Sequence, residues 1–297
     1  MNPTYRKYLA PCSIALFIFL FGLIYISCIH RTKGFSCSKI QSRHGYDPRW
    51  DFGEPSEKQK IFLDKISKET FTLLGSGKEC YAFVSEDGTI VIKFFKQKHM
   101  KTQYLLNSLP LSKQLKMIHR ECVNRHRHLR ERLFQSYQIA YERLQDHSGV
   151  LYLHLNKTNY LNQSIKLKTP KGQKFTLKLD NMEFLIQKRG YSIFDTIKAS
   201  PEKGGEVIDA VLDYLTVRNK RGIGDDDINC ERNLGLIDGK AMQIDLGELH
   251  FIPSTSPRKE ELIQATLDLK AFLETCQPAL IPYLEHEIEK RCSYGDV

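Results

Sequence analysis

The pattern of apolar and polar positions divides the chain into a membrane-type segment, a polar segment and a longer folded part. Residues 8–29 are predominantly apolar and carry no charged side chain. The segment is long enough for a helix to cross a bilayer. Basic residues are denser after this segment than before it, which predicts a cytoplasmic location for the C-terminal part. We therefore predict a short tail at 1–7 and a single-pass anchor in membrane lipid at 8–29.

Residues 30–60 mix Gly, Ser, Pro and charged residues without a sustained period, which predicts a juxtamembrane linker. Short β-branched and aromatic runs then dominate residues 61–190, with strands expected at 70–74, 80–84, 89–95, 150–155, 175–179 and 183–187. One helical stretch is expected at 103–145. Helical patterns dominate residues 191–297, with helices expected at 192–199, from 204, after 253 and at 281–291. The pattern predicts an α+β protein with a sheet-rich lobe followed by a helical lobe.

Acidic residues and a hairpin signal concentrate between Arg221 and Leu249. Three consecutive aspartates (Asp225, Asp226 and Asp227) precede Asn233, and Asp238-Gly239 separates two apolar runs. This hairpin would place Asn233 at its entrance and Asp245 at its exit, so that the two side chains converge. Amide and carboxylate oxygens suit a hard cation such as Mg²⁺. The alternative is a polar loop and a surface hairpin that bind nothing.

A second group of candidate residues lies in the first lobe. Gly75 and Gly77 occupy a turn between two expected strands, where backbone N–H groups can approach a phosphate closely. Lys93 lies in the middle of an apolar strand, where an unpaired ammonium is costly, so it requires an anionic partner. The alternative is a strand lysine whose charged end reaches the surface.

Charge and cysteine usage limit the classes of partner and of site. The net charge of +9 suits an acidic lipid surface, a nucleic acid or a phosphorylated ligand. The eight cysteines are scattered without a CxxC spacing, which argues against a zinc site and a disulfide framework. The basic residues at 113–132 are better interpreted as a solvated helix face than as a nucleic-acid surface. A basic module that binds lipid or nucleic acid through this helix remains an alternative.

The order of these motifs resembles the protein-kinase-like fold, with an antiparallel-sheet N-lobe, a helical C-lobe and, here, an N-terminal transmembrane helix. The resemblance implies that Gly75 and Gly77 cradle the phosphates of ATP and that Lys93 contacts them. It implies that Glu121, or Glu131 in its place, pairs with Lys93. It further implies that Asn233 and Asp245 bind Mg²⁺ and that Asp227 or Asp225 orients the hydroxyl of an unidentified protein or small-molecule acceptor. More loosely, the chain is similar to membrane-anchored kinase-like proteins of intracellular bacteria.

The chain also departs from the kinase pattern. The catalytic aspartate is expected five residues before the asparagine, where this chain has Ile228, while Asp227 and Asp225 lie six and eight residues before Asn233. Cys80 stands where a third glycine is expected. A pseudokinase scaffold that transfers no phosphate is therefore the principal alternative.

Overall fold

The computed structural model describes residues 34–97, 112–253 and 259–293. The predicted anchor at 8–29 lies outside these residues. Within the described ranges, no helix is both long enough and apolar enough to cross a membrane.

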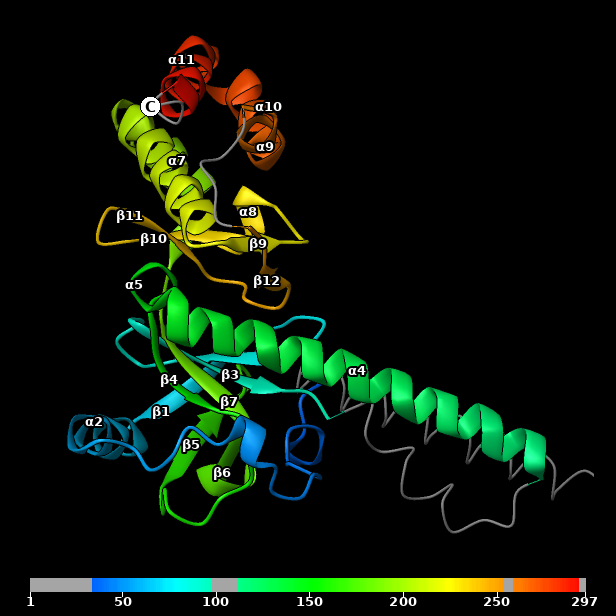
Figure 1. Cartoon of the computed structure of the whole chain (residues 1–297). Helices are drawn as coiled ribbons and strands as arrows, with labels where there is room; N and C mark the ends of the chain where they lie inside the picture. The colour runs from blue at the N-terminus through cyan, green and yellow to red at the C-terminus, as the bar shows by residue number, and fades with distance from the viewer. Residues whose placement is uncertain (1–33, 98–111, 254–258, 294–297) are drawn as a thin grey trace, which may run out of the picture.

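The N-lobe is built on a seven-stranded sheet among the described residues (Figure 1). Its strands, in spatial order, are β4 (Val150–His154), β7 (Phe184–Lys188), β3 (Ile90–Phe95), β2 (Cys80–Val84), β1 (Thr70–Ser76), β5 (Ser164–Lys168) and β6 (Lys174–Lys178). The expected all-antiparallel sheet is corrected in one place, because β1 pairs with β5 in parallel. Strand β5 was not predicted, although Ile165 and Leu167 alternate with lysines and are completely buried.

The segment before β1 packs on this sheet. It contains the short 3-10 helices η1 (Cys37–Lys39) and η2 (Pro48–Trp50) and the helix α2 (Glu57–Ser67). Phe35, Ile40 and Trp50 are 2%, 0% and 4% exposed, so the described part of the predicted linker contributes to the N-lobe core. The sequence interpretation failed here because these apolar residues are too widely spaced to produce a helix or strand period.

Helix α4 (Lys113–Arg143) is the longest element described, and its two halves differ (Figure 1). The C-terminal half lies between the seven-stranded sheet and the C-lobe, where Phe134, Tyr137 and Ala140 are buried. The N-terminal half projects away from both lobes. A short helix, α5 (Gln145–Ser148), connects α4 to β4.

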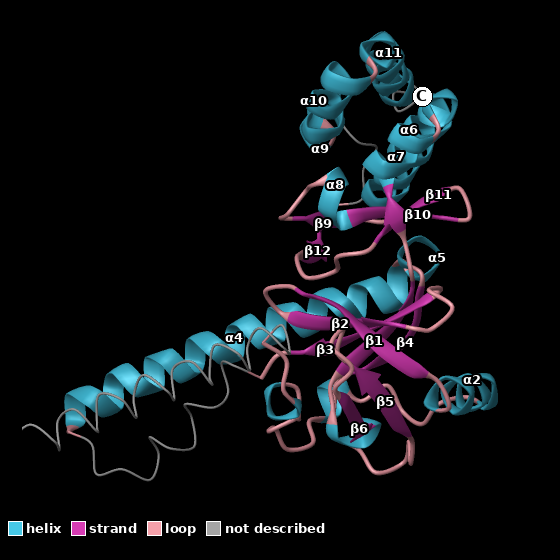
Figure 2. Cartoon of the chain, turned by 180° about the vertical axis from the view of Figure 1, so that it is seen from behind, coloured by secondary structure: helices cyan, strands magenta, loops and turns pink. Residues whose placement is uncertain are grey.

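The C-lobe combines small sheets with a group of helices (Figure 2). A three-stranded sheet contains β8 (Tyr191–Ser192), β10 (Leu234–Ile237) and β11 (Lys240–Gln243), and β9 (Ile223–Asp225) pairs with β12 (Leu249–Phe251). The helices are α6 (Ile193–Ala199), α7 (Gly204–Lys220), α8 (Cys230–Asn233), α9 (Lys259–Ala265), α10 (Leu267–Cys276) and α11 (Ile281–Ser293). The C-lobe also contains the 3-10 turns η4 (Pro201–Lys203) and η5 (Pro278–Leu280), whereas η3 (Leu179–Asn181) lies between β6 and β7 of the N-lobe.

Two local sequence signals produce the structures that they predict. Asp238 and Gly239 adopt φ values of 52° and 76° at the β10–β11 turn, as a tight hairpin turn requires. Ser192 caps α6, since its hydroxyl accepts a hydrogen bond from the backbone N–H of Asp195 at 3.1 Å. The hairpin therefore delivers Asn233 and Asp245 to the same end of the C-lobe.

Candidate functional site

A cavity of about 430 Å³ lies between the two lobes. Its walls come from the β1–β2 turn, β3, the buried half of α4, the aspartate loop and the segment after β11. Of the residues predicted for the site, the structure places these around the cavity: Gly75, Gly77, Lys93, Asp225, Asp227, Asn233 and Asp245. Glu121 does not line it.

The β1–β2 turn presents open backbone to the cavity. The Gly77 N–H donates to the Cys80 carbonyl at 3.0 Å and closes the turn. A Cβ at Gly75 would meet no heavy atom within 4 Å, and one at Gly77 would meet only the Cys80 carbonyl oxygen at 4.0 Å. Packing within the protein therefore does not require either glycine, whereas a ligand that approaches the backbone would.

Lys93 lies on β3, half-buried, and its ammonium reaches the C-lobe. Its Nζ donates to the Ile244 carbonyl, directly before Asp245. Burial lowers the pKa of Lys93, and the nearby Asp245 carboxylate partly opposes that shift. The anionic group that the sequence required near Lys93 is therefore Asp245.

Among the described residues, neither glutamate proposed for Lys93 pairs with it. Glu121 is exposed on the projecting half of α4, and Glu131 forms an ion pair with Arg49 at 3.1 Å. Tyr137 is the α4 residue that lines the cavity with Lys93, and its hydroxyl lies 3.7 Å from Cys80 Sγ. Helical periodicity predicted α4, but it does not determine which turn of a helix crosses a sheet.

Asp225 is part of the support beneath the cavity. Its carboxylate is buried, lies 3.5 Å from the guanidinium of buried Arg218 and accepts a 2.7 Å hydrogen bond from Gln243. It also accepts from the backbone N–H of Asp227 at 3.0 Å. Burial raises the pKa of Asp225, although Arg218 acts in the opposite direction.

The next two aspartates point to different partners. Asp226 forms an ion pair with Arg132 at 3.3 Å, and its carboxylate lies 3.6 Å from Nδ1 of His250. Asp227 is exposed at the cavity, and its carboxylate has no hydrogen bond or ion pair within the described ranges. The side-chain amide of Asn233 donates to the Asp227 backbone carbonyl, which holds that residue at the cavity edge. The extra residue in this loop, noted from the sequence, does not prevent Asp227 from reaching the cavity.

Gln243 links several site residues, and sequence reasoning missed it. Its fully buried side chain donates to the Asp245 carbonyl at 2.8 Å as well as to Asp225, and it accepts from the Tyr214 hydroxyl at 2.7 Å. A glutamine at a core position of β11 is the signal that could have identified it, because a buried amide needs several partners.

Leu246 and Ser136 connect the site to α4. Leu246 is completely buried in the cluster that contains Phe95, Phe134 and Tyr137. The Ser136 hydroxyl donates to the Leu246 carbonyl and accepts from the Leu249 N–H at 2.6 Å. These contacts fix the backbone around Asp245 against the buried half of α4.

The donor set fits Mg²⁺ that is shared with a phosphate ligand. Because the amide nitrogen of Asn233 is engaged by Asp227, its carbonyl oxygen remains for a cation, and the Asp245 carboxylate is exposed at the same cavity. Within the described ranges, no group of three or more His, Cys, Asp or Glu side chains could hold a metal by itself. Mg²⁺ commonly uses one or two protein oxygens together with water and phosphate oxygens, so two donors are sufficient.

Neither a protein-family model nor a curated protein sequence matches the chain. Among solved structures, the Mycobacterium tuberculosis Rv3197–erythromycin complex is similar, with 13% identity and a TM-score of 0.32. The match covers 75% of this chain and 60% of that one. The ROP18 kinase domain in complex with AMP-PNP and sucrose is similar at 13% identity and a TM-score of 0.33, with 76% of this chain and 75% of that one covered.

Both TM-scores are below 0.5, so the similarities add no support for a site or an activity. The chain's own architecture shows a mixed, two-lobed, kinase-like fold: a curled sheet carries the glycine turn and Lys93, a helical lobe carries the aspartate loop and the hairpin, and a cavity separates them.

Proposed function

We propose that this chain is a membrane-anchored, kinase-like phosphotransferase that binds ATP with Mg²⁺. The observation that carries the proposal is the convergence of Gly75, Gly77, Lys93, Asn233, Asp245 and Asp227 on one cavity between the lobes. The anchor at 8–29 would hold this domain at the cytoplasmic face of a membrane. The finer resemblance to kinase-like proteins of intracellular bacteria remains a prediction.

In the proposed reaction, an acceptor hydroxyl oxygen forms a bond to the γ-phosphorus while the bond from that phosphorus to the β–γ bridging oxygen breaks. ADP leaves, and the hydroxyl proton passes to the Asp227 carboxylate. The β1–β2 turn and Lys93 position the phosphates. Asn233 and Asp245 would hold Mg²⁺, which neutralises phosphate charge when bound.

Thermal melting of the full chain in detergent, with and without ATP and Mg²⁺, tests nucleotide binding. A ligand that binds only the folded state raises Tm by mass action. We expect a metal-dependent increase that Lys93→Ala and Asp245→Ala abolish. Lys188→Ala and Asp238→Asn are matched controls, because this lysine and this aspartate form an exposed ion pair at 3.5 Å outside the cavity. No shift at millimolar ATP would contradict the proposal.

A pseudokinase scaffold is the second candidate, favoured by Ile228 at the position expected for the catalytic aspartate. The two candidates differ in the role of Asp227. If wild type and Asp227→Asn bind ATP equally and neither forms ADP beyond the background rate with any acceptor offered, the scaffold function is supported.

A further inference from the structure

A second cavity, of about 230 Å³, lies beside the first, and its lining combines lysine and arginine side chains with apolar ones. The two cavities share Lys78, Glu79, Gly247 and Glu248, so they meet at the tip of the β1–β2 turn and the segment after Asp245. The proposed reaction involves the first cavity and leaves the second without a role.

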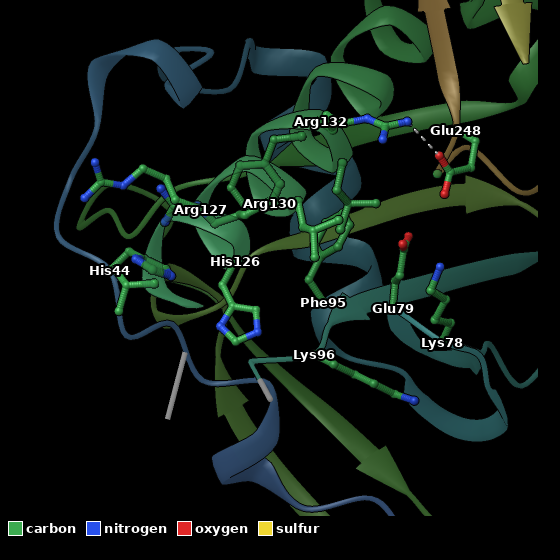
Figure 3. A pocket seen from close by; sticks show the side chains of 15 residues that line it. His44, Lys78, Glu79, Phe95, Lys96, His126, Arg127, Arg130, Arg132 and Glu248 are labelled. Atoms are coloured by element: carbon green, nitrogen blue, oxygen red, sulfur yellow. Dashed lines mark hydrogen bonds and ion pairs between the residues drawn. The ribbon is translucent and has the colours of Figure 1, made fainter. Parts of the chain in front are cut away.

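The cations come mostly from one face of α4. His126, Arg127 and Arg130 recur at helical spacing on that face, and Arg132 lies at the edge nearest Glu248. Lys78 and Lys96 complete the basic lining, and His44 lies beside them. The apolar part of the wall consists of Phe95, Val123, Leu129, Leu133 and Phe134. Figure 3 shows Glu79 and Glu248 together on one side of the cavity, with His44, His126, Arg127 and Arg130 on the other.

Arg130 gives an independent indication of a ligand. Its Nε is buried without a hydrogen-bond acceptor among the described residues, and its guanidinium lies 5.7 Å from the centre of the Phe134 ring. Burial lowers the pKa of Arg130, and the nearby Glu183, Asp47 and Glu131 carboxylates oppose that shift. Buried donors in folded proteins nearly always have an acceptor, so an anion in this cavity would complete the site.

We propose that the second cavity binds the phosphoryl acceptor and that this acceptor is a phosphorylated polyol. Arginine and lysine side chains bind phosphate oxygens through charge-assisted hydrogen bonds, and the Glu79 and Glu248 carboxylates accept hydrogen bonds from hydroxyl groups. This arrangement holds the phosphates against α4 and directs a free hydroxyl toward the first cavity and Asp227. The acceptor role rests on the proposed phosphotransfer.

The size of the cavity favours a small molecule. About 230 Å³ is below the range of roughly 300–1,000 Å³ that is typical of ligand pockets, which favours a compact ligand. A peptide or a polynucleotide would need a longer groove. The chemistry of the walls also separates a polyol from simple anions, because hydroxyl groups can donate hydrogen bonds to the Glu79 and Glu248 carboxylates and a simple anion cannot.

The binding test uses the full chain in detergent, without nucleotide, titrated calorimetrically with inositol trisphosphate and, separately, with inorganic triphosphate. We expect inositol trisphosphate to bind and triphosphate to bind at least tenfold more weakly. Arg127→Ala and Arg130→Ala should each weaken the binding of inositol trisphosphate roughly tenfold, as expected for the loss of a charge-assisted hydrogen bond. Arg130→Lys, which retains the charge, should recover part of the affinity and checks that the alanine variant lost binding rather than folding.

Arg125→Ala is the matched control, because Arg125 is an exposed cation of the same helix that does not line the cavity. Equal loss of affinity in Arg125→Ala and Arg127→Ala would indicate non-specific attraction to a basic helix and would overturn the proposal. Loss in Lys93→Ala alone would place the ligand in the first cavity and would also overturn it. Binding to acidic vesicles or RNA in preference to inositol trisphosphate would replace the small molecule with a macromolecular partner.

The transfer test separates this proposal from the proposed function. Formation of ADP that depends on inositol trisphosphate, and that Arg127→Ala reduces while the ATP-dependent Tm shift stays intact, supports both. An intact ATP shift without inositol trisphosphate binding overturns the acceptor proposal alone. Specific inositol trisphosphate binding without an ATP shift overturns phosphotransfer and leaves the second cavity as a binding site without an acceptor role.

Discussion

The two neighbouring cavities are built in different ways. The first collects residues that are distant in sequence, and its support is buried: Arg218, Asp225, Gln243 and Tyr214 are joined by hydrogen bonds and an ion pair. The second takes three of its five lysine and arginine side chains from one helix, and cations such as Arg127 and Lys78 are exposed. The first cavity is therefore coupled to folding stability, whereas the second can gain or lose charges with little effect on the fold.

The largest expected effect is on the support of the first cavity. Arg218→Ala would leave the Asp225 carboxylate buried without its cation, which typically costs about 3–5 kcal/mol. We expect this loss in the free energy of unfolding, measured by denaturant titration of the full chain. Arg221→Ala is the control, because Arg221 is exposed and donates to the Arg143 carbonyl. A loss below about 1 kcal/mol for Arg218→Ala would show that the support is dispensable.

The second prediction separates the adjacent aspartates. If Asp227 accepts the hydroxyl proton, Asp227→Asn should reduce the rate of phosphoryl transfer by roughly 10²–10⁴-fold with little change in nucleotide binding. Asp226→Asn removes only exposed contacts with Arg132 and His250 and should change the rate far less. Steady-state ADP formation measures both variants. A larger loss in Asp226→Asn would reassign the role.

The third prediction concerns the contact between α4 and the segment after Asp245. Ser136→Ala removes the hydroxyl that bridges the Leu246 carbonyl and the Leu249 N–H, and it leaves both groups buried. Such a loss costs about 1–3 kcal/mol, which denaturant titration can measure. Ser67→Ala, at an exposed hydroxyl of α2, should be close to neutral. Similar losses in the free energy of unfolding for the two variants would show that this contact does not stabilise the site.

The fourth prediction uses the buried Glu183, which lies under the N-terminal segment that supplies His44 to the second cavity. Ser42 and Gln97 each donate to the Glu183 carboxyl at 2.6 Å, yet burial raises its pKa to about 7. A raised pKa means that the folded state retains a proton that the unfolded state loses. Glu183 therefore contributes stability below its unfolded pKa near 4.5, and this contribution is lost as the pH rises to about 7.

His44 acts in the opposite direction, because burial and Arg130 lower its pKa to about 4 and its contribution to stability is lost as the pH falls. In Glu183→Gln, the folded state no longer retains this proton. The free energy of unfolding should therefore increase more steeply with pH between about pH 4.5 and 7 than in wild type. Denaturant titrations across this range measure the slope. Identical slopes would indicate that Glu183 does not hold a proton in the folded state.

The smallest expected effect is on the cations of the second cavity. Arg127→Ala should change the free energy of unfolding by less than about 0.5 kcal/mol, as for most exposed substitutions. Together with a loss of ligand binding, this result would show that Arg127 contributes to binding and not to folding stability. A loss of more than about 1 kcal/mol would mean that Arg127 belongs to the folding core, and the contrast would fail.

Local patterns account for the elements that the sequence predicted well. The β-branched run around Lys93, the Asp238-Gly239 turn and the Ser192 cap depend on neighbouring residues only, and each forms as expected. The hairpin also explains why the sequence predicts that Asn233 and Asp245 lie close together. The described N-terminal segment lacks a sustained period, so its packing on the sheet could not be recognised. Strand β5 alternates apolar residues with lysines but is only five residues long, and it was missed.

Short-range periodicity and turn chemistry in the sequence predict the lobes, the glycine turn, the hairpin and the residue types available for a metal and a phosphate. Three outcomes could not be predicted from these patterns. Asp225 is a buried support while Asp227 is exposed at the cavity, Asp245 rather than Glu121 lies near Lys93, and cations of α4 line part of a second cavity. These outcomes depend on which turn of one element meets another, and that register is set by packing among residues far apart in the chain.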